Sequence, residues 1–167
     1  MIIAIDGPSA SGKSTTAKGV SNKLGYTHID TGSMYRAVTF GLSYENIMLD
    51  DRNRIISYLR NLALKFDSNG RIILNGKNVS NAIRTVEISS KVSKISAIPE
   101  IRSKMVDFQR NIAGKSDCVL EGRDIGTVVF PNADYKFYMI ADINIRAQRR
   151  LIELKQIDES ITIEEII

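Results

Sequence analysis

The apolar and polar positions of this chain divide it into three regions. The first begins with a continuous apolar run at residues 2–5, which predicts a strand buried on both faces of a parallel sheet. A loop and an apolar stripe at helical spacing follow, and Gly25 stands where that helix should end. A second short strand at 27–29 precedes another amphipathic helix, with Met34 and Leu42 on its apolar face. This alternation of strand and helix predicts an α/β fold with a parallel sheet.

The middle region has a different pattern. Two apolar segments, 62–66 and 71–79, predict short strands connected by Asn-Gly turns. Two amphipathic helices follow, and the second of them opens at Pro99 and ends before Gly114. We therefore expect residues 45–114 to be inserted between the second and third strands of the parallel sheet.

The third region returns to the alternation of strand and helix. Residues 117–121 and 135–141 predict the third and fourth parallel strands, and Asp142 is the expected N-cap of a helix. Thr162 and Glu165 form a capping-box pair, which predicts one more helix. The sequence stops barely one turn later, and a helix that short is not stable alone. We therefore expect residues to be missing beyond this end.

The composition is that of an ordinary globular protein. The 167 residues suffice for one compact domain, and the single cysteine, Cys118, excludes an internal disulfide framework. Cys118 and the only histidine, His28, lie in apolar segments, so we expect both side chains to be structural. The sequence has neither a signal peptide nor an apolar run of the roughly 18 residues that span a membrane, so we expect a cytoplasmic protein.

The charge balance narrows the choice of partner only a little. A formal net charge of +4 favours an anionic partner but does not choose among a nucleic acid, a membrane surface and a nucleotide. The sequence has no block of basic residues and no basic patch interleaved with aromatic side chains. We therefore do not expect it to bind nucleic acid.

The loop after the first strand carries the most specific motif. Residues 7–14, GPSASGKS, match the phosphate-binding pattern G-x-x-x-x-G-K-[ST] without a mismatch. Its two glycines allow backbone N–H groups to surround a phosphate. Lys13 can reach the β- and γ-phosphates, and the Ser14 hydroxyl can bind Mg²⁺. We expect the whole loop to bind ATP, through Gly7, Pro8, Ser9, Ala10, Ser11, Gly12, Lys13, Ser14 and Thr15.

Residues outside the loop help to distinguish among the classes of protein that contain it, namely switch GTPases, motor ATPases and kinases. Switch GTPases need an NKxD segment after a later strand, which this sequence lacks there, and motor ATPases are generally larger. Arg36 follows the second strand and Arg123 the third, where ligands bind in open α/β sheets. Arg146, Arg149 and Arg150 share one face of the last complete helix. Such cations neutralise the charge that spreads over a phosphoryl group during transfer, which favours a kinase.

Three motifs together resemble those of the bacterial cytidylate kinases. They are GPSASGKST at 7–15, DTGSMYRA at 30–37 and EGRDIGTVVFP at 121–131, and their spacing matches as well. The resemblance covers the whole chain, and other small P-loop kinases share only the first motif in this form. It implies a three-layer fold of the P-loop NTPase type, with a parallel sheet flanked by helices and an inserted monophosphate-binding lobe. The implied domains are a kinase core at 1–44 and 115–167 and an inserted lobe at 45–114.

The activity that the resemblance implies is transfer of the γ-phosphate of ATP to CMP or dCMP with Mg²⁺, which gives CDP or dCDP and ADP. Lys13, Arg36 and Arg123 are then the catalytic candidates, because in-line transfer between phosphates requires positioning and charge neutralisation rather than a strong general base. Arg146 and Arg150 would add contacts to ATP. The resemblance also implies a monomer, and it leaves the preference between CMP and dCMP open.

Further residues match the acceptor site of this family. Arg36 and Arg123 would hold the CMP phosphate, and Thr31 stands where the family has a small hydroxyl residue near the acceptor. Ser93, Arg102 and Asp124 match the positions that contact the cytosine edge. An aspartate accepts a hydrogen bond from the amino group of cytosine, whereas uracil has a carbonyl there and would leave that acceptor unpaired.

One departure from the family concerns the C-terminus. The family continues with a lid rich in Arg and Asp, a last strand and a last helix, which have no counterpart in this sequence. If the chain ends at Ile167, the lid cannot close and activity would be poor. If the chain continues, the assignment is unaffected.

Three other functions stay open. A monophosphate kinase for UMP or AMP is disfavoured by Asp124, Arg102 and Ser93. A nucleotide-binding module without turnover would bind ATP but would not phosphorylate CMP. A nucleic-acid-binding protein would bind DNA or RNA with a strong salt dependence, and only the net charge supports it.

Overall fold

The computed structural model describes residues 1–156 and 162–163, which form parts of two compact units. The core unit comprises Met1–Asp30 and Ala113–Ile167, and the insert unit comprises Thr31–Ile112. The lobe boundaries expected from the sequence, 45 and 114, stay a prediction. The capping box expected at Thr162 and Glu165 lies partly outside the described residues.

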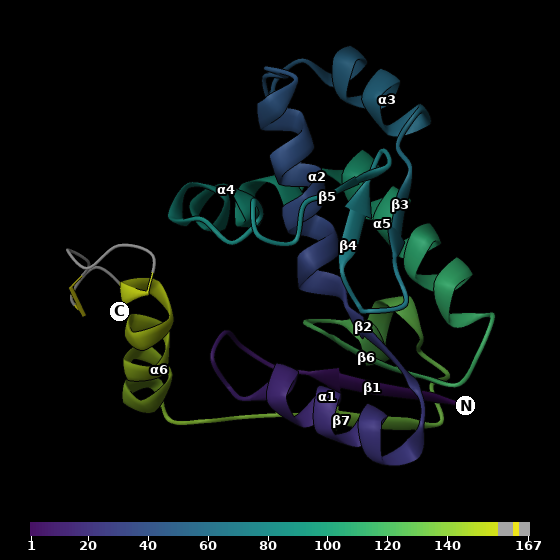
Figure 1. The fold of residues 1–167 in the computed structure, drawn as a ribbon, viewed down its shortest axis with the longest axis vertical. Helices are drawn as coiled ribbons and strands as arrows, with labels where there is room; N and C mark the ends of the chain where they lie inside the picture. The colour runs from purple at the N-terminus through teal and green to yellow at the C-terminus, as the bar shows by residue number, and fades with distance from the viewer. Residues whose placement is uncertain (157–161, 164–167) are drawn as a thin grey trace. The chain divides into compact units, whose positions relative to one another are not determined.

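The core unit contains a four-stranded parallel sheet, which confirms the α/β fold class (Figure 1). Its strand order is β2-β6-β1-β7, and all three pairings are parallel. The strands are β1 (Ile2–Asp6), β2 (Thr27–Asp30), β6 (Cys118–Gly122) and β7 (Tyr135–Tyr138). The register pairs Asp6 with both Gly122 and Tyr138, so these strands end at one edge of the sheet.

Helix α1 (Lys13–Leu24) covers one face of this sheet. Ala17 on the helix forms a buried cluster with Ile3, Ile5 and Val119 on the strands. Gly25, in a left-handed conformation, caps the helix as the sequence predicts. The expected N-cap at Asp142 is confirmed too, because its side chain accepts a hydrogen bond at the start of α6 (Ile143–Lys155).

Cys118 has the structural role expected of it. Its side chain is fully buried on β6, and burial raises the pKa of the thiol to about 11. A thiol with such a raised pKa is a poor nucleophile near neutral pH, so packing is its function.

Asp6, the last residue of β1, anchors a segment that the sequence pattern does not predict. This segment is a single π-helical turn, η1 (Ile125–Val129). The two carboxylate oxygens of Asp6 accept hydrogen bonds from the backbone N–H groups of Ile125 and Gly126, both at 2.8 Å. Because all three residues are buried, these bonds fix the start of the turn beside the end of β1.

The insert unit contains a small antiparallel sheet with strand order β3-β4-β5. Its strands are β3 (Leu64–Phe66), β4 (Ile72–Leu74) and β5 (Lys77–Asn78), which confirms the short strands expected there. The predicted Asn-Gly turn joins β4 to β5, with positive φ angles of 46° at Asn75 and 82° at Gly76. Two such angles are the requirement of the hairpin turn that asparagine and glycine favour.

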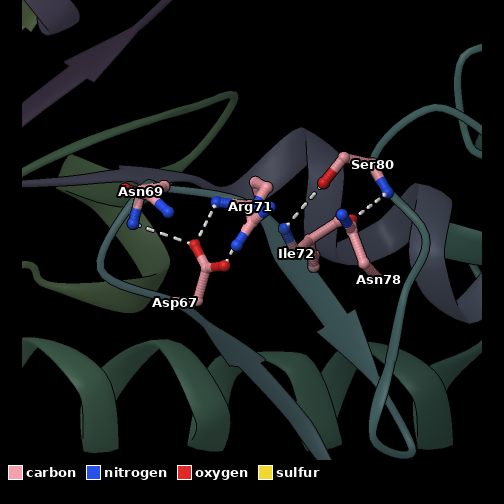
Figure 2. Close-up of polar contacts among 6 residues, drawn as sticks. All are labelled: Asp67, Asn69, Arg71, Ile72, Asn78 and Ser80. Carbon is pink, nitrogen blue, oxygen red and sulfur yellow. Dashed lines mark hydrogen bonds and ion pairs between the residues drawn. The ribbon is translucent and has the colours of Figure 1, made fainter.

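Side-chain hydrogen bonds hold the ends of this sheet (Figure 2). The Asp67 carboxylate accepts bonds from the backbone N–H groups of Asn69 and Arg71 and from the Arg71 guanidinium. These bonds, above all the one from the Arg71 backbone, lower the pKa of Asp67. On the far side of β4, the Ser80 hydroxyl accepts a bond from the Ile72 N–H.

The insert unit also contains four helices among the described residues. They are α2 (Thr31–Tyr44), α3 (Arg52–Arg60), α4 (Val86–Ser96) and α5 (Pro99–Ala113). Helix α5 opens at Pro99, as predicted, and buries Ile101 and Met105. Helix α3, which buries Ile55 and Leu59, was not predicted from the sequence. In the part of the chain that the structure describes, no helix has the length and apolar character needed to cross a membrane.

Replacing Asp6 by Asn should lower the free energy of unfolding. The amide keeps one acceptor but leaves one buried N–H of η1 without a partner, which costs about 1.5–3 kcal/mol. Asp142→Asn is the matched control, because it makes the same change at an exposed N-cap where asparagine caps equally well. Urea unfolding of both variants measures the difference. Equal effects of the two substitutions would contradict the anchoring role of Asp6.

Candidate phosphate-binding site

The loop between β1 and α1 has the backbone of a phosphate cradle. Its φ angles are 150° at Gly7, 56° at Ala10 and 98° at Gly12, the residue that precedes α1. No side chain caps this end of the helix in the described structure, so its first N–H groups face the loop. A helix N-terminus with such N–H groups attracts anions through hydrogen bonds and through the helix dipole.

Gly7 lies against the backbone at the end of the edge strand β7. A Cβ atom at this position would be 2.3 Å from the carbonyl oxygen of Met139, closer than any real contact of this kind. The close approach of the Met139 carbonyl and the φ angle of 150° at Gly7 both require glycine at this position. The first glycine of the motif therefore fixes where the loop leaves the sheet.

Lys13, the first residue of α1, is held inside the loop. Its ammonium group donates a hydrogen bond of 2.8 Å to the carbonyl oxygen of Pro8, and the residue is only 6% exposed. Burial, together with the positive charge of Arg123, lowers the pKa of Lys13 to about 8, and the negative charges of Glu121, Asp30 and Asp6 oppose this shift. The surroundings of Lys13 thus disfavour its charged form, and anionic phosphates would favour that form.

Two arginines donate hydrogen bonds to carbonyl oxygens of the loop. Arg123 donates a hydrogen bond of 2.8 Å to the carbonyl oxygen of Gly7, and Arg149 donates one of 3.3 Å to that of Ala10. Arg146 donates instead to the carbonyl oxygen of Ala141, and Arg150 pairs with Glu153. Of the three arginines on α6, the one that contacts the loop is therefore Arg149, and ATP contacts by Arg146 and Arg150 stay a prediction.

Glu121, at the end of β6, is a site residue that the sequence reasoning missed. Its carboxylate is 3% exposed and accepts a hydrogen bond of 2.5 Å from the Ser14 hydroxyl. The other carboxylate oxygen lies 3.0 Å from Nε2 of His28 on β2. The sequence does contain a pattern that could have identified it, an apolar strand that ends in an acidic residue. In P-loop proteins a carboxylate at such a strand end commonly assists Mg²⁺.

The oxygen atoms of Ser14 and Glu121 suit a hard cation such as Mg²⁺. Among the described residues, no group of three or more His, Cys, Asp or Glu side chains could hold a metal ion. Mg²⁺ commonly takes one or two protein oxygens and obtains its other ligands from phosphates and water. The residues present therefore fit Mg²⁺ that arrives with a nucleotide rather than an ion held by the protein alone.

Several residues of the expected acceptor site lie in the insert unit. Thr31 is buried at the start of α2, and the Arg36 guanidinium donates to the Ser33 hydroxyl at 3.0 Å. Burial raises the pKa of Tyr35, a residue not named from the sequence, and the positive charge of Arg102 on α5 opposes this shift. Ser93 is exposed on α4.

Asp124, the remaining residue of the expected cytosine-edge set, belongs to the core unit. It precedes η1, and its carbonyl oxygen accepts hydrogen bonds from the N–H groups of that turn. The cytosine-edge set is thus divided between the two units, with Ser93 and Arg102 in the insert unit. Its role stays a prediction.

Comparison with known proteins assigns the chain to a family. The family model described as cytidylate kinase matches residues 3–167. This chain belongs to the cytidylate kinase family. The cytidylate kinase of Caldanaerobacter subterraneus is 47% identical over 165 residues, which are 99% of this chain and 73% of that protein. The cytidylate kinase of Chloroherpeton thalassium is 49% identical over 162 residues, which are 93% of this chain and 67% of that protein.

A solved structure, that of TT1252 from Thermus thermophilus, aligns with 99% of this chain and 76% of its own length. Its TM-score is 0.47 and its sequence identity 17%, and the assignment to the cytidylate kinase family does not depend on it. The match of the family model and the curated relatives confirms the family expected from the three motifs.

Gly7→Ala should weaken both the fold of this cytidylate kinase family member and its affinity for ATP. The added methyl group meets the Met139 carbonyl and forces a strained φ angle, which together cost at least about 1–3 kcal/mol. Gly19→Ala on α1 is the matched control, because nothing lies within 4 Å of the added Cβ. Alanine favours a helix by roughly 0.5–1 kcal/mol there, so this variant should be slightly more stable and bind ATP normally. Thermal unfolding and ATP titration distinguish the two, and normal ATP binding by Gly7→Ala would contradict the cradle.

Proposed function

We propose that this protein transfers the γ-phosphate of ATP to CMP or dCMP, with Mg²⁺, to give CDP or dCDP and ADP. The observation that carries the proposal is a P-loop with a buried lysine and two contacting arginines in a chain of the cytidylate kinase family. A monomeric state, which rests on the family resemblance, and a place in the cytoplasm, which rests on the sequence features described above, belong to the same proposal.

The P-loop is the donor side of the proposed reaction. Its backbone N–H groups would surround the ATP phosphates, and Lys13 would exchange its bond to the Pro8 carbonyl for one to a phosphate oxygen. Arg123 donates a hydrogen bond to the same loop and raises the positive potential there. These groups would stabilise the charge on the transferred phosphoryl group, which is the main requirement of phosphoryl transfer.

Ser14 would hold Mg²⁺, with Glu121 as the carboxylate beside it. The chemistry that Mg²⁺ would supply there is positive charge to neutralise the charge that develops on the phosphate oxygens. The Ser14 hydroxyl already donates its hydrogen to Glu121, so its lone pairs are available for a cation.

The acceptor side of the proposed reaction uses the residues that match the acceptor site of the family. Arg36 and Arg123 would bind the CMP phosphate, with Thr31 near the acceptor, and Ser93, Arg102 and Asp124 would bind the cytosine edge. An oxygen of the CMP phosphate attacks the γ-phosphorus, the bond to the β-phosphate oxygen breaks, and ADP leaves. Because that attacking oxygen is largely ionised at neutral pH, the mechanism needs no strong general base.

A panel of acceptors tests the reaction and its specificity. With ATP and Mg²⁺, ADP release should be confined to CMP and dCMP and should be slow or undetectable with UMP and AMP. Asp124→Asn should lower kcat/KM for CMP at least about tenfold, because it would replace the proposed acceptor of a hydrogen bond from the cytosine amino group. Asp107→Asn on the exposed face of α5 is the matched control and should have no effect. ATP binding without turnover would indicate a binding module, and faster turnover of UMP or AMP would refute the role of Asp124.

The lowered pKa of Lys13 predicts a pH dependence of ATP affinity. In the empty protein Lys13 loses its proton as the pH rises through about 8, whereas bound phosphates would raise its pKa. Below that pH the lysine is charged in both states, so affinity is insensitive to its titration. Above it, binding takes up a proton, and affinity should fall by up to about tenfold per pH unit.

Calorimetry in two buffers of different ionisation enthalpy measures this proton uptake, one pH unit above and one below the pKa of Lys13. Lys13→Arg is the control, because a guanidinium stays charged and should abolish the uptake even where it weakens binding. Equal uptake by the parent protein and Lys13→Arg would show that another group titrates.

A further inference from the structure

His28 occupies a position beside the P-loop that the proposed mechanism does not use. It lies on β2, whose register pairs His28 with Val119 and Asp30 with Glu121 on β6. His28 is therefore the diagonal neighbour of Glu121, within reach of a long side chain on the same face of the sheet. The observed distance of 3.0 Å between Nε2 of His28 and Oε1 of Glu121 agrees with this geometry.

The two oxygens of the Glu121 carboxylate have different partners. Oε2 accepts the hydrogen of the Ser14 hydroxyl at 2.5 Å, and Oε1 faces His28. The carboxylate is 3% exposed, so protein groups rather than bulk water determine its orientation. A carboxylate held by donors at both oxygens cannot rotate without breaking one of these bonds.

The orientation of this carboxylate has a consequence for Ser14. A hydroxyl group has one hydrogen and two lone pairs. While the hydrogen is directed at Glu121, the lone pairs are free for a cation. If the carboxylate rotates, the hydroxyl can rotate with it and can direct its hydrogen toward the cation instead.

We propose that His28 is a positioning residue that fixes the Glu121 carboxylate through Oε1 and thereby keeps the Ser14 hydroxyl oriented to bind a divalent cation that arrives with the nucleotide. The part of this inference that concerns the cation rests on the proposed function. The hydrogen bonds among the three side chains do not depend on it. In this role His28 acts through Glu121 rather than directly on the cation.

The imidazole spectrum tests the hydrogen bond without any assay of activity. Because His28 is the only histidine of the chain, its nitrogen resonances need no assignment. We expect hydrogen on Nε2, and we expect Glu121→Gln to shift both ring nitrogens. Hydrogen on Nδ1 alone, or a spectrum that Glu121→Gln leaves unchanged, would overturn the proposal.

Substitutions at His28 test the consequence for the cation. His28→Leu removes the donor, and the Mg²⁺ concentration for half-maximal ATP binding and turnover should rise about tenfold or more, the usual effect of losing an outer hydrogen bond at a metal site. At saturating Mg²⁺, kcat should stay close to that of the parent protein. His28→Gln places an amide donor near the position of Nε2 and should restore most of the Mg²⁺ affinity.

Thr27→Val is the matched control on the same strand. It removes the hydrogen bond between the Thr27 and Ser116 hydroxyls but leaves His28 in place, so the Mg²⁺ dependence should not change. An unchanged Mg²⁺ dependence in His28→Leu, or equal losses in His28→Leu and His28→Gln, would refute the positioning role. If His28→Leu does not fold, the Mg²⁺ dependence of His28→Gln and the imidazole spectrum of the parent protein still test the positioning role of His28. A parent protein without CMP phosphorylation would refute the proposed function, whereas the imidazole spectrum would still test His28.

Discussion

The parallel pairing of β1 with β6 and β7 is the feature on which the candidate site depends. Asp6 ends β1 at the level of Gly122 and Tyr138, so the P-loop, the Arg123 segment and Met139 all begin at one edge of the sheet. The backbone N–H of Met139 donates to the Asp6 carbonyl at 2.7 Å, and the Asp6 carboxylate binds the start of η1. One residue thus links the central strand to both of its neighbours, and the loop is positioned by the sheet rather than by its own flexible backbone.

The parts of this architecture that follow from local sequence were predictable. The continuous apolar run of β1, the P-loop motif and the glycine at the end of α1 each depend on residues close together in the chain. Helix α3, of nine residues, was not among the predicted elements. The contact between His28 and Glu121 was not predictable, since the two residues are 93 positions apart and meet only through the register of β2 and β6.

Electrostatics explain why the site should respond to an anion. Lys13 is buried close to the positive charge of Arg123, and the neighbouring carboxylates of Glu121, Asp30 and Asp6 offset this only in part, because the pKa of Lys13 remains lowered. The surroundings of Lys13 therefore disfavour its charged form. Phosphates would supply negative charge beside Lys13 and Arg123, and preorganised positive charge of this kind is the form of stabilisation that phosphoryl transfer requires.

Glu121 contributes both to the electrostatics of Lys13 and to the geometry of the site. Its charge favours the protonated form of Lys13, while its two oxygens contact Ser14 on α1 and His28 on β2. An aspartate at this position would be shorter by one carbon–carbon bond, about 1.5 Å. It could not keep contacts of 2.5 and 3.0 Å to side chains of two different elements unless the helix or the strand moved. The length of this one side chain therefore matches the spacing between α1 and β2 at the P-loop, and His28 on β2 adds a contact that the P-loop motif does not reveal.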